Sequence, residues 1–230
     1  MITLRRSRDR GRGDYGWLKA RYSFAFANYH DFDHMGFRAL RVLNEDRIAG
    51  GGAFPVHPHR DMEILTYVIA GGLEHRDSMG NGSLISAGEF QLMSAGTGIR
   101  HSETNVSATD PLHLLQIWLH PDAQGFEPSY QQRSFDGREN ALVRVVSSDG
   151  IQGALRIHQD LEIYSCLLET GESIQHELAP NRHAWIQLVR GRLRVNGEVL
   201  EAGDGAALSE EPVVELHAEK SADLLLFDLA

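Results

Sequence analysis

Glycine turns divide this 230-residue chain into short apolar runs, and this pattern constrains the fold most strongly. The runs at 63–69 (EILTYVI), 114–119 (LLQIWL) and 183–189 (HAWIQLV) have strand length and are separated by turns such as AGG, SAG and VRG. Many short strands with regular turn signals are typical of an all-β sandwich or barrel. No long amphipathic helix is recognisable. The sequence predicts an all-β protein, with one hairpin turning at Asn196 and Gly197.

The composition excludes several classes of function. The formal net charge is −10, and an acidic balance argues against binding to nucleic acid. The single cysteine, Cys166, lies in an apolar run, so we expect a buried thiol, no intrachain disulfide and no CxxC metal site. The N-terminus lacks the apolar region of a secretory signal, and no run is long enough to span a membrane. We therefore expect a cytoplasmic protein that binds neither nucleic acid nor membranes.

A polar, turn-rich stretch at 126–140 marks the expected domain boundary. The order of apolar strand and glycine turn at 62–93 recurs weakly at 184–207. Two similar barrels in tandem would explain this echo. We therefore predict two domains, residues 1–130 and residues 131–230.

The stretch VHPHRDME places two histidines two residues apart. If residues 57–63 form one strand, His57, His59 and Glu63 share a face, because successive side chains alternate. On a helix, residues two apart point in different directions. Pro58 supports an extended backbone and suits an edge strand or a strand start. This spacing therefore predicts that both imidazoles reach one ion from a strand.

His101 and Glu103 repeat the same spacing about forty residues later. Three imidazoles and one carboxylate suit Fe, Mn, Co, Ni, Cu or Zn. Glu63 is either a further metal ligand or a carboxylate that orients one of the histidines. We interpret Phe54, Met93 and Ile99 as barrel core, and the alternative is that they line a pocket for a flat aromatic ligand. The histidines without comparable pairing are interpreted as surface or hydrogen-bonded core residues: His75, His113, His120, His158, His176, His183 and His217.

Two segments resemble the motifs of a known superfamily. GGAFPVHPHRDMEILTYVIAGG resembles the first cupin motif, although Gly71 falls one place late. GEFQLMSAGTGIRHSETN resembles the second, although Ser94 stands where many cupins have proline. The string MSAGTGIRHSE together with HPHxDME is more specific. It is similar to pirins, and closest to the bacterial pirin-like quercetin 2,3-dioxygenases, over essentially the whole chain.

The resemblance implies a bicupin, that is, two tandem antiparallel β-barrels of the jelly-roll type. The metal is expected in the N-terminal domain only, and the C-terminal domain is expected to be a degenerate cupin without metal. Carried over from the family, the ligands are His57, His59, His101 and Glu103. The implied cofactor is one divalent transition metal. We expect Fe(II), with Zn, Mn, Co, Ni and Cu as alternatives.

The implied activity is that of a metal-dependent dioxygenase. It would cleave the heterocyclic ring of flavonols such as quercetin with O2 and release carbon monoxide. The base that takes the proton from the flavonol 3-hydroxyl is expected to be either Glu103, as a metal ligand, or Glu63, as a residue behind the ligands.

Two other functions stay open: a non-enzymatic, metal-binding regulatory protein that acts through protein partners, and an oxygenase with another physiological substrate. A substrate-sized cavity above the metal would favour an enzyme, and a large exposed apolar patch would favour a regulator. A monomer is expected.

Overall fold

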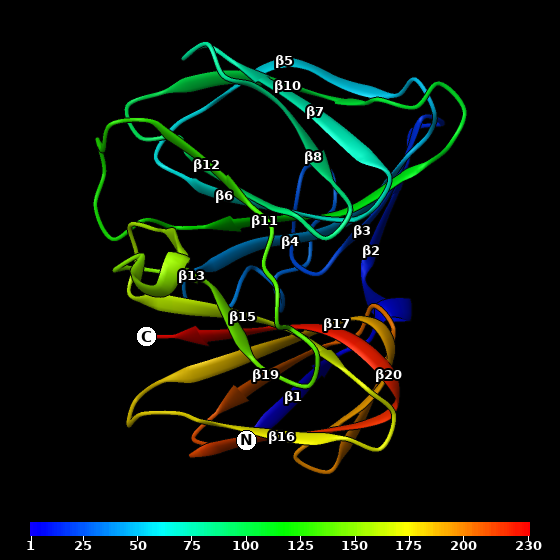
Figure 1. The fold of residues 1–230 in the computed structure, drawn as a ribbon, viewed down its shortest axis with the longest axis vertical. Coiled ribbons are helices and arrows are strands. Elements are labelled where there is room, and N and C mark those ends of the chain that lie inside the picture. Colours follow the sequence, from blue (N-terminus) through cyan, green and yellow to red (C-terminus); the bar gives the residue numbers. More distant parts are fainter. The chain divides into compact units, whose positions relative to one another are not determined.

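The computed structural model describes residues 1–230, which form twenty β-strands and two short 3₁₀ helices, η1 (Ser7–Asp9) and η2 (Ile151–Gly153). The predicted all-β fold is confirmed, and the strands fall into two compact units (Figure 1). The N-terminal unit comprises residues 11–134 and 157–159, and the C-terminal unit comprises residues 1–10, 135–156 and 160–230. The predicted boundary between residues 130 and 131 stays a prediction.

The N-terminal unit is built from two sheets. The larger has the order β12-β9-β6-β11-β4-β3-β2, and the smaller has the order β5-β10-β7-β8. The strands are β2 (Gly11–Asp14), β3 (Leu18–Tyr22), β4 (Leu40–Ile48), β5 (Ala53–His59), β6 (Glu63–Ala70), β7 (Gly72–Asp77), β8 (Gly82–Ser86), β9 (Phe90–Ser94), β10 (Ile99–Asn105), β11 (Leu112–Leu119) and β12 (Ser129–Arg133).

Apolar side chains from both sheets meet inside this unit in two separate clusters. One contains Ile48, Val68 and Leu73, and the other contains Ile64 and Met93. Strand β6 is central in the larger sheet, so its run of apolar residues is buried nearly throughout. The positions of β6 that alternate with Ile64 therefore face away from the barrel interior.

A row of polar side chains crosses the larger sheet of this unit. Gln91, Thr66, Gln116 and Asn44 lie opposite one another on β9, β6, β11 and β4. All four are buried. Buried polar groups weaken a core unless they are satisfied or serve a site. The row therefore marks the part of the barrel where a functional site is expected.

The C-terminal unit forms one continuous sheet. The main path has the order β1-β19-β17-β20-β15-β13-β14, with β16 paired to β20 and β18 paired to β17. The strands are β1 (Ile2–Arg5), β13 (Val143–Ser147), β14 (Leu155–Arg156), β15 (Leu161–Leu168), β16 (Ser173–Glu177), β17 (His183–Val195), β18 (Glu198–Glu201), β19 (Gly205–Ser209) and β20 (Val213–Leu229).

Two long strands, β17 and β20, close this sheet around its core. They pair along most of their length, with register shifts between Leu188 and Leu193. Such irregularities bend strands, which lets β20 pair with β16 at one end and with β15 at the other. The predicted hairpin is confirmed, because β17 and β18 join at Asn196 and Gly197, both with positive φ.

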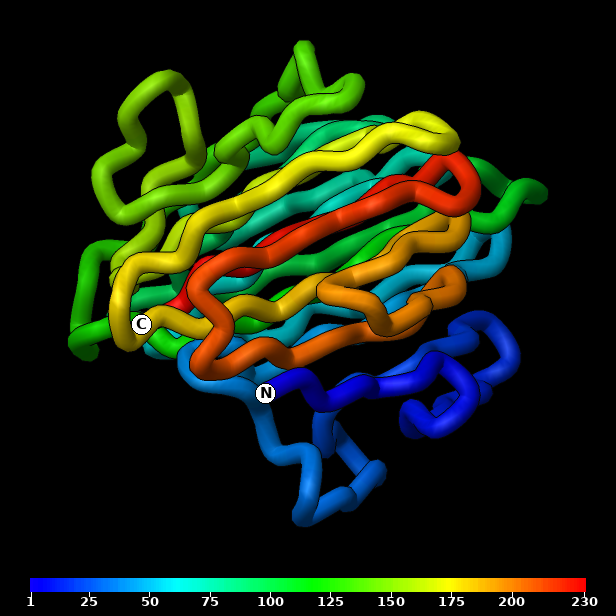
Figure 2. Tube along the Cα trace, turned by 90° about the horizontal axis from the view of Figure 1, so that it is seen from below, coloured from blue at the N-terminus to red at the C-terminus, as the bar shows by residue number.

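The first strand of the chain belongs to the C-terminal unit. Figure 2 shows the N-terminal segment beside the orange strands, and β1 pairs antiparallel with β19. The interior of this unit is filled with aliphatic side chains, and it includes Cys166 as a free buried thiol, as predicted. No helix of the structure has the length and apolar character needed to cross a membrane.

Candidate metal centre

Three histidines from two neighbouring strands converge inside the N-terminal unit. His57 and His59 lie on β5, and His101 lies directly opposite His57 on β10. The ring centroids are 4.4 Å apart for His57 and His101, 4.8 Å for His57 and His59, and 5.0 Å for His59 and His101. One ring nitrogen of each residue lies within 4.8 Å of the other two. We call these three residues the histidine triad.

The extended backbone of β5 explains this convergence. Because β5 is strand from Ala53 to His59, the two histidines share a face across Pro58. As predicted for a proline, Pro58 lies on an edge strand, since β5 is the outermost member of its sheet.

The predicted shared face of His57, His59 and Glu63 is wrong. Strand β5 ends at His59, and the chain turns through Asp61, which has φ of +47°. Strand β6 then begins at Glu63, so the alternation of side chains is interrupted before Glu63.

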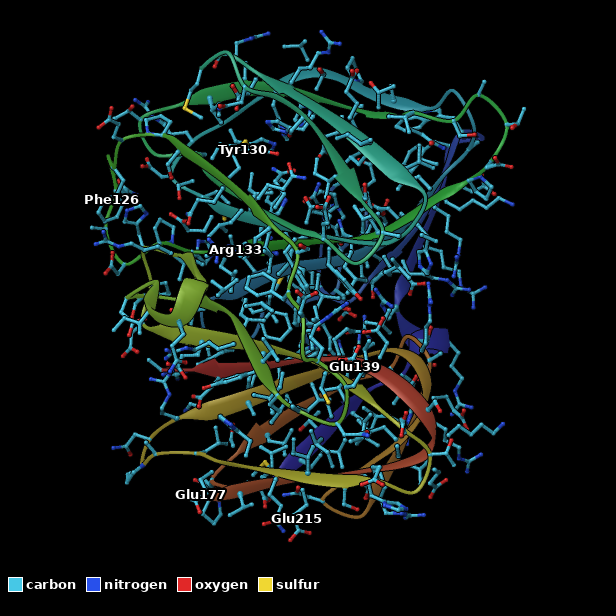
Figure 3. All side chains as sticks on the ribbon, in the orientation of Figure 1. Phe126, Tyr130, Arg133, Glu139, Glu177 and Glu215 are labelled. Atoms are coloured by element: carbon cyan, nitrogen blue, oxygen red, sulfur yellow. The ribbon has the colours of Figure 1, made fainter.

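Glu63 faces away from the histidine triad. It lies opposite Ser94, whose hydroxyl donates to Oε2 at 2.7 Å, and its Oε1 is 3.0 Å from Nδ1 of His158. Phe126, labelled in Figure 3, stacks on His158. Burial raises the pKa of Glu63, and the bonds to Ser94 and His158 oppose this shift. The structure therefore places Glu63 in a different network.

Glu103 enters the barrel interior on the same face of β10 as His101, and it is 2% exposed. The Gln116 amide donates to both of its oxygens, at 3.2 and 3.1 Å, and the Thr66 hydroxyl donates to Gln116 Oε1 at 3.0 Å. Burial raises the Glu103 pKa to about 7, against the lowering effect of Gln116. Glu103 clusters with His101 and His75 rather than with all three members of the triad.

The electrostatics favour neutral imidazoles at His59 and His101. Burial lowers the His101 pKa to about 3 and the His59 pKa to about 4, and the neighbouring His57 contributes to both shifts. A neutral imidazole is the form that binds a metal.

The hydrogen bonding of His57 and His101 also leaves ring nitrogens available to bind a metal. The Nδ1 atom of His57 is 2.8 Å from the Pro55 carbonyl, which leaves Nε2 as its ligand atom. Nε2 of His101 is buried and has no hydrogen-bond partner. A buried nitrogen without a partner is costly in a protein interior, and a metal ion would satisfy it. The donor set of this site therefore fits a first-row transition metal.

His75 was predicted to be a surface or hydrogen-bonded core residue, and it is a hydrogen-bonded core residue, but its position beside the triad was not predicted. His75 on β7 is fully buried, and its Nδ1 lies 3.4 Å from Nδ1 of His101. The sequence offers one local signal, because His75 and Asp77 have the same i, i+2 spacing as His101 and Glu103, but the contact with His101 depends on the pairing of β7 with β10. The other histidines interpreted as hydrogen-bonded include His113, which pairs with Glu45 at 2.9 Å.

A cavity of about 310 Å³ lies beside the triad. His57, His59 and Glu103 contribute to its lining, and the rest is mostly aromatic and apolar: Leu18, Tyr22, Phe26, Phe54, Pro55 and Trp118, with Asn44, Asp46 and Gln116 as polar members. Phe54 therefore lines the cavity, whereas Met93 and Ile99 belong to the core, as predicted. The volume falls at the lower end of the range for small-molecule sites.

Comparison with known proteins agrees with this architecture. A family model described as "Pirin" matches residues 3–119, and one described as "Quercetinase C-terminal cupin domain" matches residues 144–229. The chain belongs to the pirin family. The resemblance to pirins and the predicted bicupin fold are thereby confirmed.

Full-length relatives lie within this pirin family. The chain is 49% identical to quercetin 2,3-dioxygenase of Escherichia coli K12, covering 100% of this chain and 99% of the relative. It is 39% identical to a pirin-like protein of Caulobacter vibrioides, covering 96% of each.

Two solved pirin structures are similar over the whole chain. The crystal structure of YhhW from Escherichia coli has a TM-score of 0.98 at 49% identity, covering 100% of this chain and 98% of that one. A structure of bacterial pirin YhhW in complex with nickel(II) has a TM-score of 0.96 at 48% identity, covering 100% and 99%.

Proposed function

We propose that this protein is a metal-dependent quercetin 2,3-dioxygenase, which cleaves the heterocyclic ring of flavonols with O2 and releases carbon monoxide. Identity of 49% over the full length to a protein of that name supports the activity. The structural observation that supports it is the aromatic-lined cavity beside the histidine triad. A flat polyphenol matches such walls, because aromatic side chains bind aromatic rings by stacking and edge contacts.

The proposed ligands are His57, His59, His101 and Glu103. The first three already converge, and Glu103 lines the same cavity as His57 and His59. The proposed ion is Fe(II), with Zn, Mn, Co, Ni or Cu as alternatives, and the nickel(II) in the related structure is consistent with a site of this kind. A divalent metal held here supplies Lewis acidity, which lowers the pKa of a hydroxyl that contacts it.

Glu103 is the proposed base for the flavonol 3-hydroxyl. Its carboxylate faces the cavity, whereas Glu63 lies on the other side of the sheet and is bonded to Ser94 and His158. A base must reach the proton it abstracts, and this requirement supports the proposal of Glu103 over Glu63.

The remaining walls orient the substrate and limit water. Trp118 packs edge-on against His59 at 4.9 Å and against Phe26 at 5.4 Å, which fixes the aromatic side of the cavity next to the triad. Phe54 packs edge-on against Trp17. Held rings of this kind position a flat substrate against the metal ligands. The monomeric state and the cytoplasmic location stay predictions.

The test is oxygen uptake with quercetin by protein that has been stripped of metal and reloaded with Fe(II). His59→Ala, treated in the same way, removes one proposed ligand, and His113→Ala is the matched control, because His113 pairs with Glu45 away from the triad. We expect uptake with wild type and the control and none with His59→Ala. Uptake no greater than that of free metal would refute a flavonol dioxygenase and favour a metal-binding regulatory protein or an oxygenase with another substrate.

A further inference from the structure

His75 and Asp77 stand beside the triad on the strand that neighbours β10. In the register of β7 and β10, His75 lies opposite Glu103, and Asp77 lies opposite His101. The side chains of both residues have no solvent exposure. Tyr130 on β12, labelled in Figure 3, stacks on the His75 ring at 4.8 Å. The imidazole of His75 is therefore held on the inner face of the barrel.

Both nitrogens of His75 are engaged. Its Nε2 is 3.2 Å from Oδ2 of Asp77, and its Nδ1 is 3.4 Å from Nδ1 of His101. The Asp77 carboxylate also accepts bonds from the backbone N–H of Met79 and of Asn81, at 2.9 and 3.0 Å, and from the Asn81 amide at 2.8 Å. Asp77 is thus a pure acceptor, fixed by the turn that follows β7.

This arrangement sets the position of each ring proton. Because Asp77 only accepts, the proton of a neutral His75 lies on Nε2, and Nδ1 carries the lone pair. His101 must then donate from its own Nδ1. The lone pair of His101 consequently lies on Nε2, the buried atom without a hydrogen-bond partner.

We propose that His75, oriented by Asp77, is a positioning residue that fixes the tautomer and ring orientation of His101 for metal binding through Nε2. This inference rests on the metal site proposed above. Histidine ligands of metals usually donate their second ring N–H to an acceptor, and loss of that acceptor typically weakens metal binding about 10- to 100-fold.

The alternative role for His75 is that of a ligand, because one ring nitrogen each of His75 and His101 and a carboxylate oxygen of Glu103 lie within 4.8 Å of one another. The contacts argue against it. Asp77 occupies Nε2 of His75, and His101 occupies Nδ1, so His75 has no nitrogen left to offer.

The experiment measures Ni(II) affinity of the full-length protein by calorimetric titration. His75→Phe keeps a ring against Tyr130 but removes the acceptor, and His75→Leu repeats this loss with another shape. His75→Asn restores an acceptor near the position of Nδ1. His113→Leu is the matched control, since His113 also pairs with a carboxylate in this unit.

We expect His75→Phe and His75→Leu to bind Ni(II) about 10- to 100-fold more weakly than wild type. His75→Asn and His113→Leu should bind it like wild type. Nickel X-ray absorption should count three imidazoles in wild type and in every His75 variant. A merely structural role would not predict rescue by asparagine.

Other results overturn the inference. Undiminished affinity in both apolar variants would remove the positioning role. One imidazole fewer in those variants than in wild type would make His75 a ligand. His59→Ala, measured in parallel, separates the two proposals. If His59→Ala binds Ni(II) like wild type, the metal site itself is wrong; if it alone loses Ni(II), only the role of His75 fails.

Discussion

Replacement of Gln116 by leucine tests how the buried carboxylate of Glu103 is held. The Gln116 amide donates to both carboxylate oxygens and accepts the Thr66 hydroxyl, and all three side chains are buried. Gln116→Leu keeps a similar volume and removes both functions. Thr66→Val removes only the hydroxyl that orients the amide.

The size of the effect follows from these contacts. A hydrogen bond to a charged group contributes about 1.5–3 kcal/mol, and a buried hydroxyl left without an acceptor costs about 1–3 kcal/mol. We therefore expect Gln116→Leu to lower the free energy of unfolding of the metal-free protein at pH 8 by about 3 kcal/mol. Thr66→Val alone should cost about 1 kcal/mol. In the Gln116→Leu background it should instead recover stability, because it removes the buried hydroxyl that Gln116→Leu leaves without an acceptor.

Urea unfolding followed by tryptophan fluorescence measures these differences. Gln91→Leu is the matched control, since Gln91 is a fully buried glutamine of the same row whose amide atoms have no hydrogen-bond partner. It should be neutral or stabilising. If Gln116→Leu costs no more than Gln91→Leu, or if the Thr66 and Gln116 changes add, the polar row does not hold Glu103.

Three further predictions concern other parts of the chain. Burial raises the Cys166 pKa to about 11, so a thiol reagent should leave the folded protein unmodified and label it in urea; labelling of the folded protein would contradict the buried position. Burial acts to raise the Asp228 pKa, but bonds from His176 and Arg182 outweigh it and lower that pKa below its ordinary value of 3.8. The resulting stability is present above that value and lost as pH falls, so Asp228→Asn should flatten the acid-side decline in unfolding free energy; parallel profiles for the two proteins would count against it. The side-chain amide of Asn105 donates to the carbonyls of Ile48, Ala49 and Asp110. Asn105→Ala should therefore lower the free energy of unfolding, measured by urea titration, by about 3 kcal/mol. A loss below about 1 kcal/mol would contradict this.

The local patterns of the sequence were sufficient for the all-β class and for the shared face of His57 and His59, whereas the approach of His101 depends on the pairing of β5 with β10 and was implied by the family resemblance. The spacing of His57 and His59 predicts that both side chains lie on one face of a strand, because side chains alternate between the two faces of any extended backbone. The Asn196–Gly197 turn is equally local. The position of Glu63 was not predictable from alternation, since a single residue with positive φ, Asp61, ends β5 before Glu63.

The parts of the site that escaped prediction depend on pairing between distant strands. His75 reaches His101 only because β7 pairs with β10 in a particular register. Gln116 meets Glu103 across the barrel, from β11 of the opposite sheet. Strand β1 likewise pairs with β19, about two hundred residues later. Register between distant strands follows from the packing of the whole sheet, which local spacing does not encode.

The most direct test of the central claim is a metal titration of flavonol cleavage. Metal-free protein would receive Fe(II) in steps, and oxygen uptake and carbon monoxide release with quercetin would be recorded at each step. Both rates should rise linearly and stop at one ion per chain, with equal amounts of gas consumed and released. Rates that keep rising in proportion to Fe(II) beyond one ion per chain, or uptake without carbon monoxide, would contradict a single catalytic centre at His57, His59, His101 and Glu103.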